Sequence, residues 1–581
     1  MAFLRWGITL FALLLTVTAF GQSTDIPFGS KDYPVLDRLE IKSGLFPEQF
    51  SSGIKPISRR AAVAYALAVD SLAAKDPSII SSVEHPYWVT TGLSEIDRYN
   101  LRKLLADNGE WAPDSLSFEP SRVPWVKTFY KNKTNLYEVN VPDFYLAVNP
   151  LLLLQIGKES NNDEALYINT RGLEVRGRIA DKVGFYAMLS ENQERPPFFM
   201  QDRIDKWQAV PGIGYYKNIK NRSGGYDYFN AAGYVSFGVT KYIDVQFGYG
   251  NNFIGDGYRS LLLSTNAANY LYLKLHTRIW KLDYENIFAE LISQYPRGEG
   301  DFLRPKKYMA MHHLGVNLTR WLNVGAFESV VFSRKDHFEF QYLNPIIFYR
   351  AIEQMVGSPD KVIVGLDAKA NVAHHFQFYS QFFLNELKVK EFFGNRGWWG
   401  NKWGLQLGGK YVDAFNVPNL DLQGEVNVVR PYTYTHGDSV ANYTHYNQPL
   451  AHPWGANFAE FIGIVRYQPV KKLYLEARGI YGDQGLDYPG TNYGSNIFMD
   501  YKTREKEYGN TIGQGLKSRT LNVLLLASYE VRDNLFVDLS FQTRKTGGAY
   551  KTYYPEEGKR SETNFFSAAL RWNLGRRIYD Y

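Results

Sequence analysis

Alternating polarity between residues 520 and 545 is the feature that most restricts how this chain can fold. Apolar side chains occupy every second position in 521–529 and again in 535–541, and polar residues such as Ser528 and Asp538 fall on the other parity. A polar turn joins the two stretches. Because successive strand side chains point to opposite faces, each stretch predicts a strand with one apolar and one polar face. One such hairpin is equally compatible with a soluble sandwich.

The same pattern recurs through most of the chain. We predict about 18 strands, at 151–158, 165–178, 183–190, 227–238, 242–250, 268–278, 282–293, 307–318, 322–333, 361–371, 376–388, 402–413, 419–430, 457–467, 472–481, 518–530, 535–546 and 562–572. Their connections alternate between short turns and long polar segments, as periplasmic turns and extracellular loops do in outer-membrane barrels. A soluble sandwich or solenoid has no reason to keep this alternation. The sequence therefore predicts an all-β fold, an antiparallel transmembrane β-barrel over 150–581, in the outer membrane with both termini periplasmic.

Composition agrees with a membrane barrel. Aromatic residues make up 16% of the chain, with 43 Tyr, 37 Phe and 12 Trp, and barrels carry aromatic girdles at both membrane interfaces. After residue 21 no apolar run approaches the roughly 20 residues of a membrane helix, so strands would hold the chain in the membrane. Lys and Arg total 65 against 59 for Asp and Glu. This balance argues against a nucleic-acid partner, which requires a dominant basic surface.

Residues 1–21 have the features of a secretory signal peptide. Arg5 supplies the positive charge, an apolar stretch follows, and the small residues Ala19 and Gly21 precede a predicted cleavage at Gln22. The alternative, an anchor that stays attached, requires a longer apolar run. The chain contains no cysteine, so it has no disulfide and no lipidated cysteine.

Residues 22–149 are expected to form a small helical periplasmic domain and a lead-in to the barrel. The Ala-rich stretch 59–74 favours helix. A second helix is predicted at 94–107, where Ser94 can cap the N-terminus and Asp97 follows three residues later. The alternative is an extended linker with transient helices, because short helices depend on tertiary packing.

Polarity also predicts which side chains face lipid and which face the lumen. A charged side chain on the lipid face costs on the order of 2–4 kcal/mol at the bilayer midplane, so the apolar parity must face outward. In 268–278, for example, Leu271 and Leu273 face lipid and Tyr270 and Tyr272 face inward. The charges that we place in the lumen are Lys274, Arg278, Asp421, Glu425, Glu476, Arg478, Asp538 and Arg544. Mixed charges can pair and fill a lumen or line an open pore, and the sequence leaves both possibilities open.

Motifs for catalysis or metal binding do not emerge from the sequence. His312 and His313 are neighbours on a predicted strand, so their side chains point to opposite faces. His436, His445 and His452 share one loop without the spacing of a zinc site. No motif fixes a Ser/His nucleophile, and there is no phosphate-binding loop or dinucleotide fingerprint. We therefore expect no catalytic residue, no metal ion and no cofactor.

The predicted loop at 394–403 combines three Trp with Asn, Arg and Lys. Aromatic faces beside amide and guanidinium donors suit the rings and hydroxyls of sugars, which makes Arg396, Trp398 and Trp399 candidates for glycan binding. The alternative is an aromatic girdle at the outer rim of the barrel, where Trp is enriched.

Four stretches carry a resemblance to a known family. Residues 248–264 read GYGNNFIGDGYRSLLLS, where a predicted strand ends in a glycine-rich segment before an apolar run. The others are QYLNP at 341–345, the run 404–427, and DNGEW at 107–111. In these stretches the chain resembles the Wzi-type capsule assembly proteins of the outer membrane, including the RemB-like gliding-motility branch. The likeness spans most of the mature chain and is strongest over 230–480.

This resemblance implies a barrel of about 18 strands with a helical periplasmic portion. It also implies a non-enzymatic role in attaching or organising surface polysaccharide, or in motility machinery. Surface polysaccharide and outer-membrane lipid are thus the expected partners. The candidate glycan-binding residues at the outer face are Tyr258, Arg259, Arg396, Trp398 and Trp399. For Tyr258 and Arg259 the alternative is a structural turn, because glycines at strand–loop junctions often mark one.

Two other functions remain open from the sequence. One is an accessory subunit of an outer-membrane motility, secretion or assembly machine, with other outer-membrane or periplasmic proteins as partners. The other is a channel whose mixed-charge lumen passes small solutes.

Overall fold

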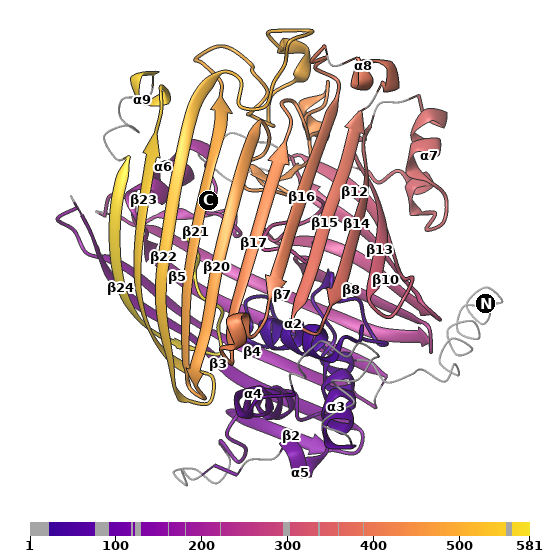
Figure 1. Cartoon of the computed structure of the whole chain (residues 1–581), viewed down its shortest axis with the longest axis vertical. Helices are drawn as coiled ribbons and strands as arrows, with labels where there is room; N and C mark the ends of the chain where they lie inside the picture. The colour runs from indigo at the N-terminus through magenta and orange to yellow at the C-terminus, as the bar shows by residue number, and fades with distance from the viewer. Residues whose placement is uncertain are drawn as a thin grey trace, which may run out of the picture.

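The dominant feature of the molecule is a closed antiparallel β-barrel (Figure 1). The structure, a computed structural model, describes residues 23–75, 92–117, 120–121, 129–160, 162–180, 182–220, 222–293, 303–334, 337–357, 360–386, 388–394, 396–553 and 561–581. The predicted signal peptide at 1–21 lies outside these residues. An 18-strand wall is closed by pairing of the last wall strand with the first. The predicted fold class is therefore confirmed.

Each predicted strand corresponds to one strand of the wall. The wall strands are β3 (Phe144–Glu159), β4 (Leu166–Ile179), β5 (Val183–Arg195), β7 (Tyr226–Thr240), β8 (Ile243–Gly250), β10 (Tyr270–Ile279), β11 (Leu282–Ile292), β12 (Lys306–Asn317), β13 (Leu322–Phe332), β14 (Lys361–Val372), β15 (Phe376–Glu386), β16 (Lys402–Tyr411), β17 (Leu420–Val429), β20 (Phe458–Val470), β21 (Leu473–Leu486), β22 (Leu516–Arg532), β23 (Leu535–Gly547) and β24 (Glu562–Trp572). Short strands in the connections and the N-terminal part are β1 (Ile54–Lys55), β2 (Tyr137–Val141), β6 (Lys217–Asn218), β9 (Phe253–Ile254), β18 (Thr444–His445) and β19 (Gln448–Pro449).

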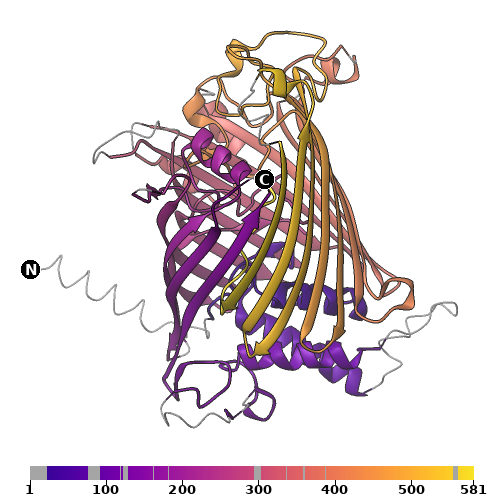
Figure 2. The same cartoon turned by 90° about the vertical axis from the view of Figure 1, so that its left-hand side faces the viewer.

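Short and long connections lie at opposite ends of the barrel, as predicted from their alternation. We call these the short-turn end and the long-loop end. The long connections carry the helices α6 (Phe198–Trp207), α7 (Tyr349–Met355), α8 (Val389–Phe393) and α9 (Tyr550–Tyr553). The N-terminal helices gather at the short-turn end, opposite α8 and α9 (Figures 1 and 2).

Strand β3 begins at Phe144, earlier than the predicted start at residue 151, and Pro150 lies inside it. One edge of β3 pairs with β4 throughout. The other edge pairs with β2 up to Val148 and with β24 from Leu152 onward. Pro150 falls between these two partners, where its missing N–H removes no hydrogen bond from the ladder.

Exposure along the wall follows the predicted parity. In β10, Leu271 is 38% exposed between Tyr270 at 1% and Tyr272 at 2%. An apolar belt of exposed side chains surrounds the barrel, including Ile156, Leu189, Phe229, Phe247, Leu366, Phe378, Leu407, Leu539 and Phe566. Within the described residues, no helix has both the length and the apolar character needed to cross a membrane.

The N-terminal part is helical and has its own small core. Its helices are α2 (Asp32–Ser43), α3 (Arg59–Lys75), α4 (Glu95–Asp107) and α5 (Asp114–Ser117). Helix α4 begins at the predicted cap, where Ser94 and Asp97 form a reciprocal capping box. Helix α2 was not predicted, and it ends at Gly44, whose φ of 66° suits glycine. The buried residues of this core include Ile26, Leu36, Leu39, Phe50, Ile57, Val63, Ala66, Leu101 and Leu104.

Candidate functional site

Among the described residues, the parts of the chain that enter the lumen include residues 23–58, the connection 251–269 and the C-terminal tail 573–581. Strand β1 of the first pairs with β9 of the second. Arg259 of the second donates to the backbone carbonyl of Asp580 in the tail at 2.6 Å. Figure 2 shows the tail returning into the barrel after β24 ends at the short-turn end. The three segments thus bind each other as well as the wall. The periplasmic position expected for both termini stays a prediction.

Helix α2 is fixed to the wall through two cations one helical turn apart. Arg38 and Lys42 both bind Asp413, in the turn after β16, at 2.9 and 2.7 Å. The same cations bind Asp97 of α4 at 3.0 and 2.7 Å. Arg38 also binds Asp421 of β17. Because residues four apart share one face of a helix, a single face of α2 makes all these contacts.

The electrostatics of this cluster favour the charged forms of Asp413 and Asp97. Burial alone would raise the pKa of Asp413, but the Arg38 and Lys42 charges outweigh it and lower that pKa to about 2. Burial opposes the same two cations at Asp97 as well, and its pKa is also lowered. The cluster therefore holds two ionised carboxylates against two buried cations.

Tyr258 and Arg259 lie inside the lumen and not at the outer face. The Tyr258 and Arg259 N–H groups donate to the Glu425 carboxylate at 2.6 and 3.0 Å. The Tyr258 hydroxyl donates to Asp580. Gly257 passes so close to Glu425 that an added Cβ would lie 2.6 Å from its carboxylate. The glycines of this segment thus permit close approach of its backbone to the wall. This agrees with the alternative given above, in which the segment has a structural role.

The charges predicted for the lumen contact the inward-folded segments or each other. Lys274 lies 3.7 Å from Glu285, Glu476 lies 3.3 Å from Arg478, and Arg478 lies 3.3 Å from Asp580. The remaining members and their partners are Arg278 with Asp283 and the Pro47 carbonyl, Asp421 with Arg38, Glu425 with Tyr258 and Arg259, Asp538 with Arg571, and Arg544 with the Tyr581 carbonyl. The sequence left open whether these charges pair or line an open pore, and in the structure they are paired or hydrogen-bonded.

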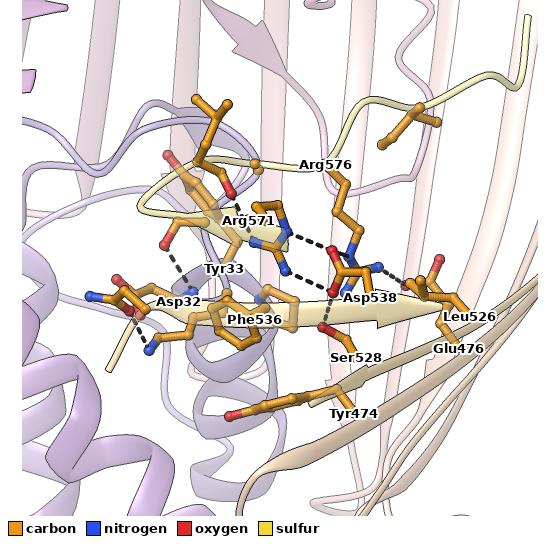
Figure 3. A pocket seen from close by; sticks show the side chains of 18 of the residues that line it. Asp32, Tyr33, Tyr474, Glu476, Leu526, Ser528, Phe536, Asp538, Arg571 and Arg576 are labelled. Atoms are coloured by element: carbon orange, nitrogen blue, oxygen red, sulfur yellow. Dashed lines mark hydrogen bonds and ion pairs between the residues drawn. The ribbon is translucent and has the colours of Figure 1, made fainter. Parts of the chain in front are cut away.

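A cavity of about 560 Å³ remains between the N-terminal segment, the tail and the wall from β20 to β24 and β3. Figure 3 shows Asp538 facing Arg571 and Arg576; it lies 2.8 Å from Arg571 and 3.8 Å from Arg576. Burial and the nearby Asp107 carboxylate raise the pKa of Asp32 at the edge of this cavity to about 6. Ion pairs of Asp538 thus border the cavity on the side of the wall.

Trp398 and Trp399 lie at the long-loop end, where they pack between loops. They are 8% and 9% exposed. The Trp399 ring lies 4.8 Å from that of Tyr501, and the Arg504 guanidinium lies 4.3 Å from the Trp399 ring centre. The backbone N–H of Trp399 donates to the Glu507 backbone carbonyl at 2.9 Å. Trp399 therefore joins its own loop to the connection 487–515, and Trp398 packs beside Trp399 at 5.7 Å between ring centres.

Arg396 stands on the solvent side of the same loops. Its side chain is 57% exposed, binds Glu391 at 2.7 Å, and lies 4.9 Å from the Tyr508 ring centre. Tyr508 is itself 45% exposed. Nothing in the sequence pattern singles out Tyr508, because its neighbour Arg396 is 112 positions away. Together they form an exposed surface of an aromatic ring and a guanidinium.

The three histidines of the connection 430–457 have separate partners. His452 binds Glu460 at 2.7 Å, and His445 accepts from the Ile292 N–H at 2.9 Å. Among the described residues, no group of three or more acidic or imidazole side chains is arranged to hold a metal ion.

Comparison with solved structures identifies the fold. Wzi of Escherichia coli, described as an outer membrane protein involved in group 1 capsule assembly and as a carbohydrate-binding β-barrel, matches with a TM-score of 0.54 and 11% identity, over 96% of this chain and 100% of Wzi. OprD of Pseudomonas aeruginosa matches with a TM-score of 0.41 and 12% identity, over 74% of this chain and 96% of OprD. OccAB2 of Acinetobacter baumannii matches with a TM-score of 0.41 and 11% identity, over 74% and 97%.

No protein-family model and no curated protein matches the sequence. The match to Wzi extends over the N-terminal helices as well as the wall, since it covers 96% of this chain. The resemblance seen in the sequence is thereby confirmed for the fold. This chain has the fold of the Wzi barrel, an outer-membrane β-barrel, and its own N-terminal part is helical.

Proposed function

We propose that this protein binds surface polysaccharide at its long-loop end and holds it at the cell surface, without catalysing a reaction. In this proposal the long loops face the outside of the cell, and the helical part, over 22–149, faces the periplasm. The full-length likeness to a carbohydrate-binding barrel supports the proposal.

The observation that carries the proposal is the filled lumen. Lys42, 1% exposed, and Arg259, 8% exposed, belong to segments that occupy the interior. Wall charges such as Arg478 and Asp538 bind those segments or each other. Charges that would line a solute path are therefore used in internal contacts, which favours binding at the surface over permeation.

We place the glycan contact on Arg396 and Tyr508. An exposed tyrosine ring can stack on a sugar ring, and the guanidinium beside it can donate to hydroxyl or carboxylate oxygens. Trp398 and Trp399, buried between the loops, position this surface. Tyr258 and Arg259 would support it only indirectly, because they lie in the lumen and bind Glu425 and Asp580.

The test is a deletion strain in which polysaccharide bound to cells and polysaccharide shed into the medium are both measured. We expect normal synthesis with increased shedding, restored by the wild-type protein. The double variant Arg396→Ala, Tyr508→Ala should fail to restore retention while inserting normally. Tyr553→Ala is the matched control, because Tyr553 is also exposed at the long-loop end, at 50%.

Unchanged retention in the deletion strain would refute the proposal and favour an accessory subunit of an outer-membrane machine. Pull-down from outer membranes would then identify the partners. Stepwise single-channel currents from the purified protein in planar bilayers would instead favour the solute channel.

A further inference from the structure

The connection between β13 and β14 folds outward over the barrel wall. We call residues 337–357 of this connection, which include α7, the outer strap. Figure 1 shows α7 beside the wall and outside it. The strap residues Tyr342, Tyr349 and Ile352 pack on wall residues of β11–β14, namely Phe288, Tyr308, Ala310, Val330, Phe332 and Val362.

These wall residues are on the outward parity. Their sequence neighbours Ile287, Ala289, Met309, Met311 and Val331 belong to the core inside the barrel. Because side chains alternate across a strand, the strap covers the face that an outer-membrane barrel turns toward lipid.

Beneath the strap lies a polar pair on this outward face. His312 and Glu328 are directly opposite on β12 and β13 and lie 3.1 Å apart. The Glu328 carboxylate accepts the Tyr349 and Arg350 N–H groups at 2.8 and 2.9 Å. The His312 ring stacks on Tyr349 at 4.4 Å between centres.

A charged pair on the outward face needs such a cover if that face lies at membrane depth. A carboxylate that faces hydrocarbon is strongly unfavourable unless it is paired and hydrogen-bonded. Here both Glu328 oxygens are bound, and the residues are only 7% (His312) and 3% (Glu328) exposed. The sealed pair is thus compatible with lipid on the other side of the strap.

The opposite side of the strap is apolar and exposed. Phe340, Ile346, Phe348 and Met355 are 77%, 83%, 73% and 77% exposed. The adjacent strand β14 continues this surface with Val364 at 45% and Leu366 at 59%, both part of the outward wall. Contiguous exposed apolar side chains of this kind mark a contact surface.

We propose that the outer strap is seated in the membrane, with Phe340, Ile346, Phe348 and Met355 in contact with the lipid of the leaflet at the long-loop end. Continuity with the lipid-facing wall and the polar pair sealed beneath favour lipid over a protein partner. Irregular backbone is tolerated there because the strap is packed on the barrel. Arg350, 57% exposed beside Phe348, is placed to reach lipid head groups. This inference is independent of glycan binding.

The absence of cysteine makes a direct test possible. Single-cysteine variants Ile346→Cys and Phe348→Cys, each carrying an environment-sensitive fluorophore, are reconstituted as full-length purified protein in phosphatidylcholine vesicles. Leu539→Cys, on the outward wall and 57% exposed, is the lipid-facing control. Lys506→Cys, exposed in the connection 487–515, is the water-facing control. Quenching is measured with doxyl-labelled lipid in the vesicles and with iodide in the buffer.

We expect both strap labels to be quenched by doxyl lipid to within about twofold of the Leu539 label, since both would contact acyl chains, and to be shielded from iodide. Iodide quenching equal to that of the Lys506 label, with no doxyl quenching, would overturn the proposal. This would be the result if the strap lies in water or waits for a protein partner absent from the vesicles. Shielding from both quenchers would also overturn it, because a second copy of the chain would then cover the strap.

Discussion

Removing the Asp413 carboxylate should release the helical part from the barrel without unfolding the wall. Asp413 binds Arg38 at 2.9 Å and Lys42 at 2.7 Å, and the Lys42 side chain is 1% exposed. Loss of one partner of a buried ion pair costs about 3–5 kcal/mol. Asp97 stays within 3.0 Å of the same cations, so we expect Asp413→Ala to destabilise the docked state by about 2–3 kcal/mol.

Native-state hydrogen exchange measures this local opening directly. Because 1.4 kcal/mol corresponds to a factor of ten, protection of the α2 amides should fall by roughly 30- to 150-fold. Amides of β23 should keep their protection. Asp413→Asn, which keeps the acceptor oxygen but not the charge, should have a smaller effect. Lys281→Ala, in an exposed short turn, should have none. Unchanged α2 protection, or an equal loss in α2 and β23, would refute the reasoning.

Two further predictions concern the wall and the response to pH. Leu539→Arg places a charge on the outward face and should impair membrane insertion, at a cost of about 2–4 kcal/mol near the midplane. Ser540→Arg, on the lumen side, should insert. Equal behaviour of the two variants in a vesicle-insertion assay would show that the parity of β23 is assigned wrongly. The Asp413 pKa falls on folding from 3.8 to about 2, so its contribution is present above pH 4 and is lost as pH decreases from 4 to 2. Helical circular dichroism at 222 nm should therefore decrease in this range, and a signal that stays flat down to pH 2 would contradict the assignment.

The barrel could be predicted from the sequence because its signals are local. The alternation of apolar and polar residues in β22 and β23 is visible within each strand. The polar turn between the two strands shows where one ends and the next begins. The capping box of α4 likewise involves Ser94 and Asp97, three positions apart. The start of β3 was predicted too late, because a proline normally ends a strand and here Pro150 lies where one edge of β3 lacks a partner.

The direction in which each long connection folds could not be predicted. Arg38 and Lys42 are part of a polar segment in sequence, and only their contact with Asp413, 375 and 371 positions away, shows that they anchor a helix. Tyr258 and Arg259 likewise look like loop residues in sequence, because their partners are distant. In the structure Glu425 and Asp580 hold them in the lumen. The outer strap folds the opposite way, over His312 and Glu328. Such choices depend on residues distant in sequence, which periodicity does not reveal.

The contacts of the helical part also constrain the order of assembly. Lys31 binds Asn534 across 503 positions, and Lys103 binds Asp533 across 430. These N-terminal residues therefore meet their final partners only after the hairpin of β22 and β23 exists. Until then its apolar helices have no complete binding surface, a situation in which chains aggregate or misassemble. Biogenesis of this protein should thus depend on factors that shield residues 23–117 until the wall is nearly closed, and truncation of β22–β24 should leave the helical part unprotected.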